Sequence, residues 1–167
     1  MSIARGPAMF RPRPSRLKGF DYRGEHRYSL RFTVFHRQCF FRNAAMVALT
    51  WKQILRAAVE EHFAVIAYCF MPDHVHLVVA GMGPSANLEV FFVNAKRYPA
   101  VRFREQFGTR LWERGGFERV LRAEEHTPDV VRYVLENPVR AGLVSHPRDY
   151  PFLGSSVYRL DELLEWA

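Results

Sequence analysis

The sequence predicts an α+β fold in which one antiparallel sheet carries helices. Three observations predict it. Several segments alternate apolar and polar residues with the two-residue period of a strand, and two longer segments repeat apolar residues at helical spacing. Two strand-like apolar runs are also joined by a turn too short for a parallel crossover. The 167 residues, 49% of them hydrophobic, suffice for one domain with a substantial core.

The first half of the chain predicts a strand, a helix and a hairpin. A strand is expected over residues 28–36, where apolar and polar side chains alternate. Asn43 can cap a helix that is expected to run to about Glu61 with one apolar face. The apolar run 64–70 and the strand 74–80 are separated by a Met-Pro-Asp turn, which predicts a central hairpin.

The second half predicts two further helices around another extended segment. A helix is expected from Leu88, and Pro99 is expected to kink or end it. An extended segment at 111–121 is interrupted by two glycines. Thr127, followed by proline, opens a short helix that is expected to stop near Asn137, because the next residue is again proline. A short amphipathic helix is expected in the tail.

The order strand, helix, strand, strand, helix, strand is the split βαβ arrangement. It predicts a ferredoxin-like, RRM-like βαββαβ antiparallel sheet with helices on one face and an additional C-terminal helix. Three units are expected along the chain: a flexible basic arm at 1–21, one compact domain at 22–158, and a tail helix at 159–167.

The net charge of +7 favours a polyanionic partner, since Lys and Arg neutralise phosphates in nucleic-acid complexes. Three arginines of the N-terminal arm are candidate DNA contacts, although a solvated tail explains them equally well: Arg11, Arg13 and Arg16. Lys96, Arg97 and Arg140 are further candidates on predicted helices. Each of these residues has the alternative of being a solvated surface charge.

The two cysteines predict small buried apolar side chains in a reducing compartment, because they are far apart and form no CxxC pair. The first twenty residues contain no apolar run long enough for a signal peptide or a membrane span. We therefore expect a cytoplasmic protein without membrane attachment.

Residues 71–79 (MPDHVHLVV) contain two histidines two positions apart at the start of an apolar strand. Alternate side chains of a strand share a face, so His74 and His76 are expected on one side while Val75 and Leu77 point into the core. Two neutral imidazoles on one rigid face can chelate a metal. The alternative is a pair of surface polar residues on a half-buried strand.

Tyr133 and Asn137 are four residues apart on the predicted Thr127 helix, so they lie side by side on its flank. A tyrosine hydroxyl is a poor nucleophile at neutral pH, and a nearby divalent cation would favour its reaction. From the helix alone, Tyr133 is better explained as an amphipathic surface residue and Asn137 as a helix-end residue before Pro138.

Residues 71–79, followed about fifty residues later by 133–144 (YVLENPVRAGLV), resemble the signature of the REP-associated tyrosine transposases, relatives of the single-tyrosine HUH transposases. The resemblance implies that His74 and His76 bind Mg2+ or Mn2+, that Asn137 completes the metal site, and that Tyr133, on a C-terminal helix, is the nucleophile. It implies an endonuclease and strand transferase that cleaves and rejoins single-stranded DNA through a 5′-phosphotyrosine.

The resemblance further implies substrates that are DNA hairpins formed by short palindromic repeats, and a site built by a monomer or a homodimer. From ligand chemistry alone, imidazole would favour Mn2+ or Zn2+, so Mg2+ rests on the resemblance. The chain departs from the family pattern at three positions, which are Glu118, Glu136 and Pro99.

Two other functions fit parts of the sequence. A non-catalytic, domesticated nucleic-acid-binding protein of the same fold needs no nucleophile, and the conjunction of two histidines with Tyr133 and Asn137 argues against it. A zinc hydrolase of the barrel type would need a longer chain and further ligands after the histidine pair.

Overall fold

The computed structural model describes residues 17–122 and 126–166. In chain order its strands and helices are β1 (Arg27–Thr33), α1 (Ala44–Glu60), β2 (Phe63–Met71), β3 (His74–Gly81), α2 (Leu88–Phe107), β4 (Phe117–Leu121), α3 (Thr127–Leu135), α4 (Asn137–Arg140), β5 (Leu153–Gly154) and α5 (Leu160–Trp166). Short 3-10 turns lie at Phe35–Arg37, Phe40–Arg42 and Pro147–Asp149.

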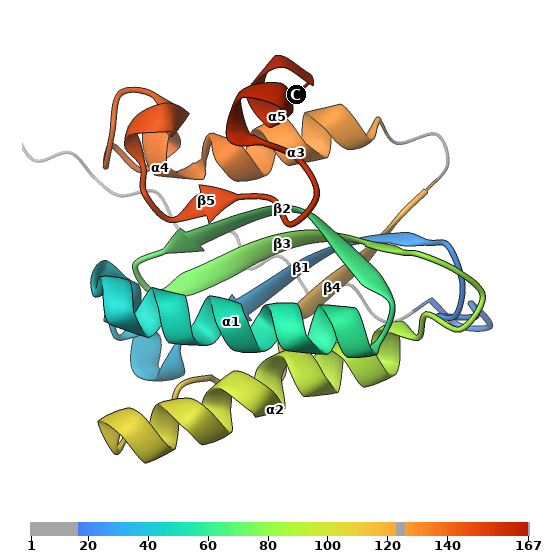
Figure 1. Cartoon of the computed structure of the whole chain (residues 1–167), viewed down its shortest axis with the longest axis horizontal. Coiled ribbons are helices and arrows are strands. Elements are labelled where there is room, and N and C mark those ends of the chain that lie inside the picture. Colours follow the sequence, from blue (N-terminus) through green and yellow to red (C-terminus); the bar gives the residue numbers. More distant parts are fainter. Residues whose placement is uncertain (1–16, 123–125, 167) are drawn as a thin grey trace, which may run out of the picture.

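The sheet has the strand order β4-β1-β3-β2-β5, and every pairing in it is antiparallel (Figure 1). The first four strands with α1 and α2 form the ferredoxin-like βαββαβ unit, so the predicted fold class is confirmed. The short strand β5 adds to the free edge of β2.

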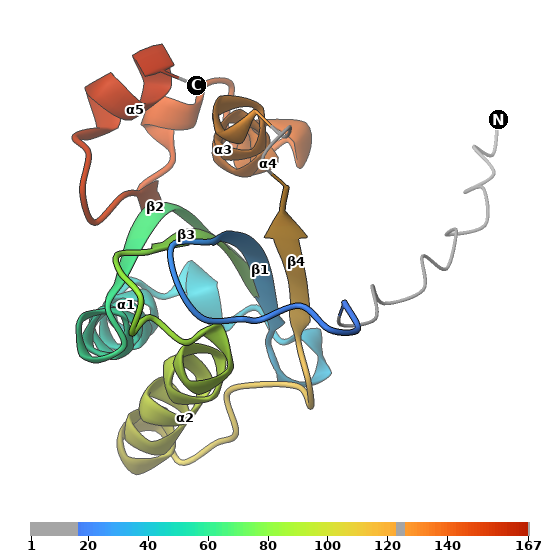
Figure 2. The ribbon, with the colours of Figure 1, turned by 90° about the vertical axis from the view of Figure 1, so that its right-hand side faces the viewer.

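Helices cover both faces of the sheet. Helices α1 and α2 lie on one face, and the C-terminal helices α3, α4 and α5 lie on the other (Figure 2). Each face has its own apolar core: Leu30, Phe32 and Phe91 belong to the first, whereas Val131 and Leu163 belong to the second. Among the described residues, no helix is both long and apolar enough to cross a membrane.

The central hairpin of β2 and β3 lies between the two cores, and alternate side chains of β3 point into one core or the other. Val75, Leu77 and Val79 of β3 are fully buried in the core under α1 and α2. Val78 is buried in the second core, and His76, two residues before it, points to that same face. The predicted alternation along this strand is confirmed.

Helix α2 continues through Pro99 to Phe107, so of the two expected effects of the proline, a kink or an end, the end is wrong. Pro99 lacks the N–H for one helical hydrogen bond. It is nevertheless buried, as is Phe103 in the next turn of the helix, and burial of apolar surface opposes the cost of the lost bond. The helix instead ends at Gly108, whose φ of 69° is in the left-handed region.

Two other boundaries and the exposure of one cysteine differ from the sequence prediction. Strand β1 ends at Thr33, because His36 and Arg37 take positive φ angles in a tight turn. Of the segment 111–121, only the part from Phe117 forms a strand, since Gly115 and Gly116 bend the chain before it. Cys39 is exposed, whereas Cys69 is buried as predicted.

Candidate functional site

His74 and His76 converge on one point of the sheet face that carries α3. Their Nε2 atoms are 3.0 Å apart, and the two rings are nearly perpendicular. Two ligands about 2.1 Å from one ion and at a right angle to each other lie about 3.0 Å apart. The pair therefore fits two neighbouring positions around a small divalent cation.

Asp73 fixes the orientation of the first imidazole. Its Oδ1 lies 2.6 Å from Nδ1 of His74, and its Oδ2 pairs with Arg37 at 3.2 Å. When Nδ1–H donates to this carboxylate, Nε2 keeps its lone pair for a metal. Sequence reasoning assigned Asp73 only to a turn, although a carboxylate next to a histidine is a recognisable signal for this role.

The surroundings keep both imidazoles neutral. Burial, with smaller contributions from His74, Arg31 and Arg140, lowers the pKa of His76 to about 3. Burial also lowers the pKa of His74, although Asp73 opposes the shift. Both rings are therefore unprotonated at neutral pH, which is the form that binds a cation.

The low pKa of His76 predicts a pH-dependent stability. The folded state disfavours protonation of His76. The contribution of this neutral ring to the free energy of unfolding is therefore complete above the ordinary histidine pKa of about 6.5, and it is lost as the pH falls toward 3. Without divalent ions, the wild type should lose about 1 kcal/mol more free energy of unfolding between pH 7.5 and 5.5 than His76→Asn. Urea unfolding at both pH values measures this difference, and equal losses would contradict the assigned environment.

Asp73→Asn should weaken Mn2+ binding about 10- to 100-fold while the fold is retained, because outer partners of metal-binding histidines contribute to that extent. Calorimetric titration with Mn2+ measures the affinity. Arg37→Gln is the matched control, since it removes the other partner of Asp73 and leaves the contact with His74 in place. Equal losses in both variants would assign the effect to the Asp73–Arg37 pair instead.

Helix α3 places Tyr133 on the same side of the sheet as the histidines. The helix packs on β2 and β3 through its apolar stripe, in which Val131, Val134 and Leu135 are buried. The Tyr133 side chain is 57% exposed. The guanidinium of Arg140 lies 4.0 Å from the centre of the Tyr133 ring and donates a hydrogen bond to the Tyr133 carbonyl.

Asn137 begins α4 directly after α3. Its Nδ2 donates to the backbone carbonyls of Tyr133 and Val134 at 3.1 and 3.2 Å. The other polar atom of its side chain is Oδ1, the atom type that a hard cation binds. Across residues 17–122 and 126–166, no cluster of three or more His, Cys, Asp or Glu side chains could hold a metal.

The structure does not bring Lys96 and Arg97 to this site. Lys96 and Arg97 lie on α2, which covers the opposite face of the sheet (Figure 2). The Lys96 amino group donates to the carbonyls of Glu113 and Gly115, and Arg97 donates to Asn94. Three predicted residues lie outside the described part of the chain: Arg11, Arg13 and Arg16.

Arg31 was missed by sequence reasoning. It pairs with His76 across β1 and β3, so both side chains project from the same face of the sheet. Its charge contributes to the low pKa of both histidines. A cation beside the imidazole pair is suited to a substrate phosphate.

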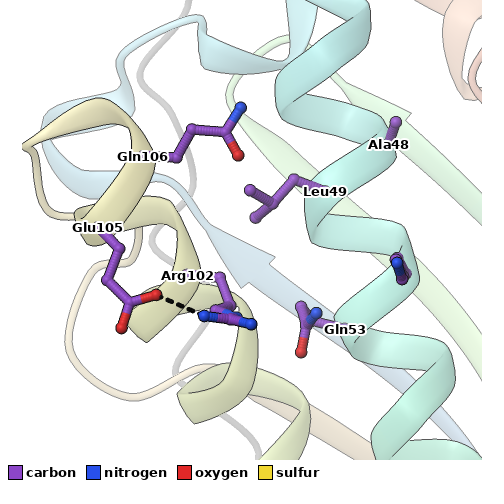
Figure 3. A pocket seen from close by; sticks show the side chains of 7 residues that line it. Ala48, Leu49, Gln53, Arg102, Glu105 and Gln106 are labelled. Carbon is purple, nitrogen blue, oxygen red and sulfur yellow. Dashed lines mark hydrogen bonds and ion pairs between the residues drawn. The ribbon is translucent and has the colours of Figure 1, made fainter.

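A separate pocket lies between α1 and α2, on the face of the sheet away from the histidines (Figure 3). Its lining includes Leu49 and Gln53 of α1, and its rim carries the ion pair of Arg102 and Glu105 at 2.8 Å. The residues that line this pocket include no histidine, cysteine or tyrosine. This pocket therefore presents none of the side-chain types found at the histidine pair.

Comparison with protein families places these residues in a known context. The family model described as "Transposase IS200 like" matches residues 23–137. This stretch runs from just before β1 to the first residue of α4, and it contains His74, His76, Tyr133 and Asn137. No curated protein matches the chain significantly.

Three solved structures share the fold. A REP-associated tyrosine transposase bound to a REP hairpin has a TM-score of 0.69 and 18% identity, covering 83% of this chain and 81% of that chain. A candidate transposase from Deinococcus radiodurans R1 has a TM-score of 0.50 and 23% identity, covering 74% and 96%. A bacterial tRNA(His) guanylyltransferase (Thg1)-like protein in complex with GTP has a TM-score of 0.50 and 14% identity, covering 79% and 74%.

Proposed function

This chain belongs to the IS200-like transposase family, and we propose that it cleaves and rejoins single-stranded DNA with Tyr133 as the nucleophile. His74, His76 and Asn137 would hold a divalent ion, Mg2+ or Mn2+. The observation that carries the proposal is the convergence of the two Nε2 atoms, 3.0 Å apart, on the sheet face where α3 packs. A binding protein would not require two neutral imidazoles aimed at one point.

Three features of the histidine pair and its surroundings support an ion there. Both imidazoles are neutral at neutral pH, Asp73 lies where it favours the tautomer that leaves Nε2 of His74 available, and Asn137, one turn after Tyr133, would offer its amide oxygen. When bound, the ion would supply positive charge to a phosphate oxygen. Arg31, which is paired with His76 across β1 and β3, and Arg140, which lies on the Tyr133 ring, would bind neighbouring phosphate oxygens.

The reaction would be an exchange of phosphodiester bonds. The Tyr133 oxygen, having lost its proton to solvent, forms a bond to phosphorus while the bond from phosphorus to the 3′ oxygen breaks. The leaving 3′ oxygen takes a proton, and the 5′ phosphate stays on Tyr133. Attack by another 3′ hydroxyl reverses these steps, so rejoining needs no external energy source. Arg140, stacked on the ring, would hold Tyr133 in position.

We propose DNA hairpins from short palindromic repeats near the gene as substrates, in line with the REP hairpin bound by one structural relative. Residues 22–158 would form the catalytic unit. Lys96 and Arg97 on α2, and the three arginines of the N-terminal arm, would contact more distant parts of the strand. The packing of α3 on β2 and β3 of the same chain favours a site completed within one protomer.

The test is incubation of the full chain with labelled single-stranded hairpins from the flanks of its own gene, with Mn2+ or Mg2+. We expect a covalent adduct that survives SDS and is absent with EDTA. Cleaved DNA with a free 3′ hydroxyl should accompany the adduct. Tight binding of these hairpins without cleavage in any divalent ion would favour the non-catalytic binder.

A further inference from the structure

A row of directly paired residues crosses the sheet at the level of the proposed metal site. Phe117 of β4 pairs with Arg31 of β1, and Arg31 pairs with His76 of β3. Directly opposed residues of an antiparallel sheet project from the same face. Phe117 and Arg31 therefore share the face of the histidine pair, and Phe117 is two strands, or about 10 Å, from His76.

On this face α3 packs on β2 and β3, so the His76 end of the row lies beside that helix. Arg31 is exposed and Phe117 is half-buried. The Arg31 guanidinium lies 5.9 Å from the centre of the Phe117 ring. An aromatic ring next to a cation is the combination with which proteins bind single-stranded nucleic acid, because the ring stacks on a base and the cation binds the backbone.

Gly116 holds this arrangement against the sheet. A Cβ atom at position 116 would lie 2.7 Å from the ring of Phe92 and 3.3 Å from the carbonyl oxygen of Arg31. A side chain at this position would have to displace the Phe92 ring of α2 and would crowd the backbone of β1 at Arg31, so glycine favours this close approach. Strand β4 begins directly after this close contact, at Phe117, which pairs with Arg31 of β1.

We propose that Phe117 and Arg31 form a subsite for the nucleotide next to the cleaved phosphodiester, with its base stacked on Phe117 and its phosphate bound by Arg31. The subsite rests on the proposed function for its substrate. The separation across the row allows one nucleotide to place its phosphate beside His76 and its base over Phe117. Charge also favours this occupant, because an anionic strand complements Arg31 and a chain with a net charge of +7.

The test uses the full chain carrying Tyr133→Phe, in EDTA, so that binding is measured without cleavage. Single strands from the gene flanks carry the fluorescent base 2-aminopurine at each unpaired position in turn. We expect quenching at one position beside the cleavage site, lost in Phe117→Ala and kept in Phe117→Tyr. The Kd should rise about 5- to 100-fold in Phe117→Ala, which corresponds to one lost base stack.

An abasic nucleotide at the quenched position provides the matched control on the DNA side. The abasic nucleotide should raise the Kd of the Tyr133→Phe protein. It should also abolish the difference in Kd between that protein and the one that carries Phe117→Ala in addition. A difference that persists on abasic DNA would assign Phe117 to folding of the edge strand and overturn the subsite.

Charge substitutions test the second half of the subsite. Arg31→Gln should reduce the slope of log Kd against log salt concentration by about 0.7, the value for one phosphate contact on a single strand. Arg102→Gln removes the same charge from α2, on the opposite face, and should leave the slope unchanged. Equal effects of the two substitutions would overturn the role of Arg31.

These outcomes separate the subsite from the proposed chemistry. If the wild type cuts the flanking hairpins and Phe117→Ala binds them with unchanged Kd, the subsite is wrong and the chemistry stands. If base quenching depends on Phe117 and no flanking strand is cut, the subsite stands and the chemistry fails. If the chain binds none of these strands, both are wrong.

Discussion

Tyr133→Phe is expected to abolish the covalent DNA adduct and to reduce strand cleavage by at least about 1,000-fold. The substitution removes one oxygen, the atom that would attack phosphorus, and leaves the ring on which Arg140 lies. Because the Tyr133 side chain is 57% exposed, the loss of its hydroxyl should change the free energy of unfolding by less than about 0.5 kcal/mol. Denaturing gels of labelled hairpins measure adduct and product together.

Tyr158→Phe is the matched control for this substitution. Tyr158 is 44% exposed and its ring stacks on Trp166, so the same oxygen is removed from another tyrosine near the C-terminal helix. This variant should form the adduct at the wild-type rate. An adduct of normal yield in Tyr133→Phe would move the nucleophile to another residue and would leave Tyr133 as a surface side chain.

The fold could be predicted from the sequence because its elements have clear periods and the connection between β2 and β3 is short. The same periodicity predicted that His74 and His76 share a face, which the structure confirms. The membership of the transposase family, expected from two spaced motifs, is confirmed as well. The assignments of Tyr133 and Asn137 remain predictions, although the structure places both on helices above the histidine-bearing face.

Contacts set by strand register and turn geometry could not be predicted. Arg31 meets His76 only because β1 and β3 pair in one register, and a shift of one residue would reverse the face. The contact of Arg140 with Tyr133 depends on the turn by which α4 follows α3. The periodicity of a single segment predicts neither the contact of Arg31 with His76 nor that of Arg140 with Tyr133.

The position of Lys96 and Arg97 could have been inferred more closely. Val75 and Leu77 point into the core that α1 and α2 cover, so the histidines must face the other way. A residue on α2 is consequently separated from the histidine pair by the sheet. The sequence prediction considered the exposure of these cations and omitted the side of the sheet on which their helix packs.

His76→Ala is expected to weaken Mn2+ binding by more than about 100-fold and to abolish adduct formation at micromolar Mn2+. The loss of an outer partner of a metal ligand already weakens binding 10- to 100-fold, and the loss of a ligand itself should exceed that. The neutral state of His76 leaves no protonated form of this ring to compete with the ion near pH 7.

Two further measurements separate metal binding from folding and from DNA binding. His126→Ala makes the same change at an exposed histidine that precedes α3 and makes no capping hydrogen bond through its side chain, and it should bind Mn2+ as the wild type does. In EDTA, His76→Ala should bind single-stranded hairpins within about threefold of the wild-type Kd, because Arg31, Phe117 and Arg140 are unchanged. If His76→Ala retained wild-type Mn2+ affinity, the convergence of the two rings would be a feature of packing, and the ion would have to bind elsewhere.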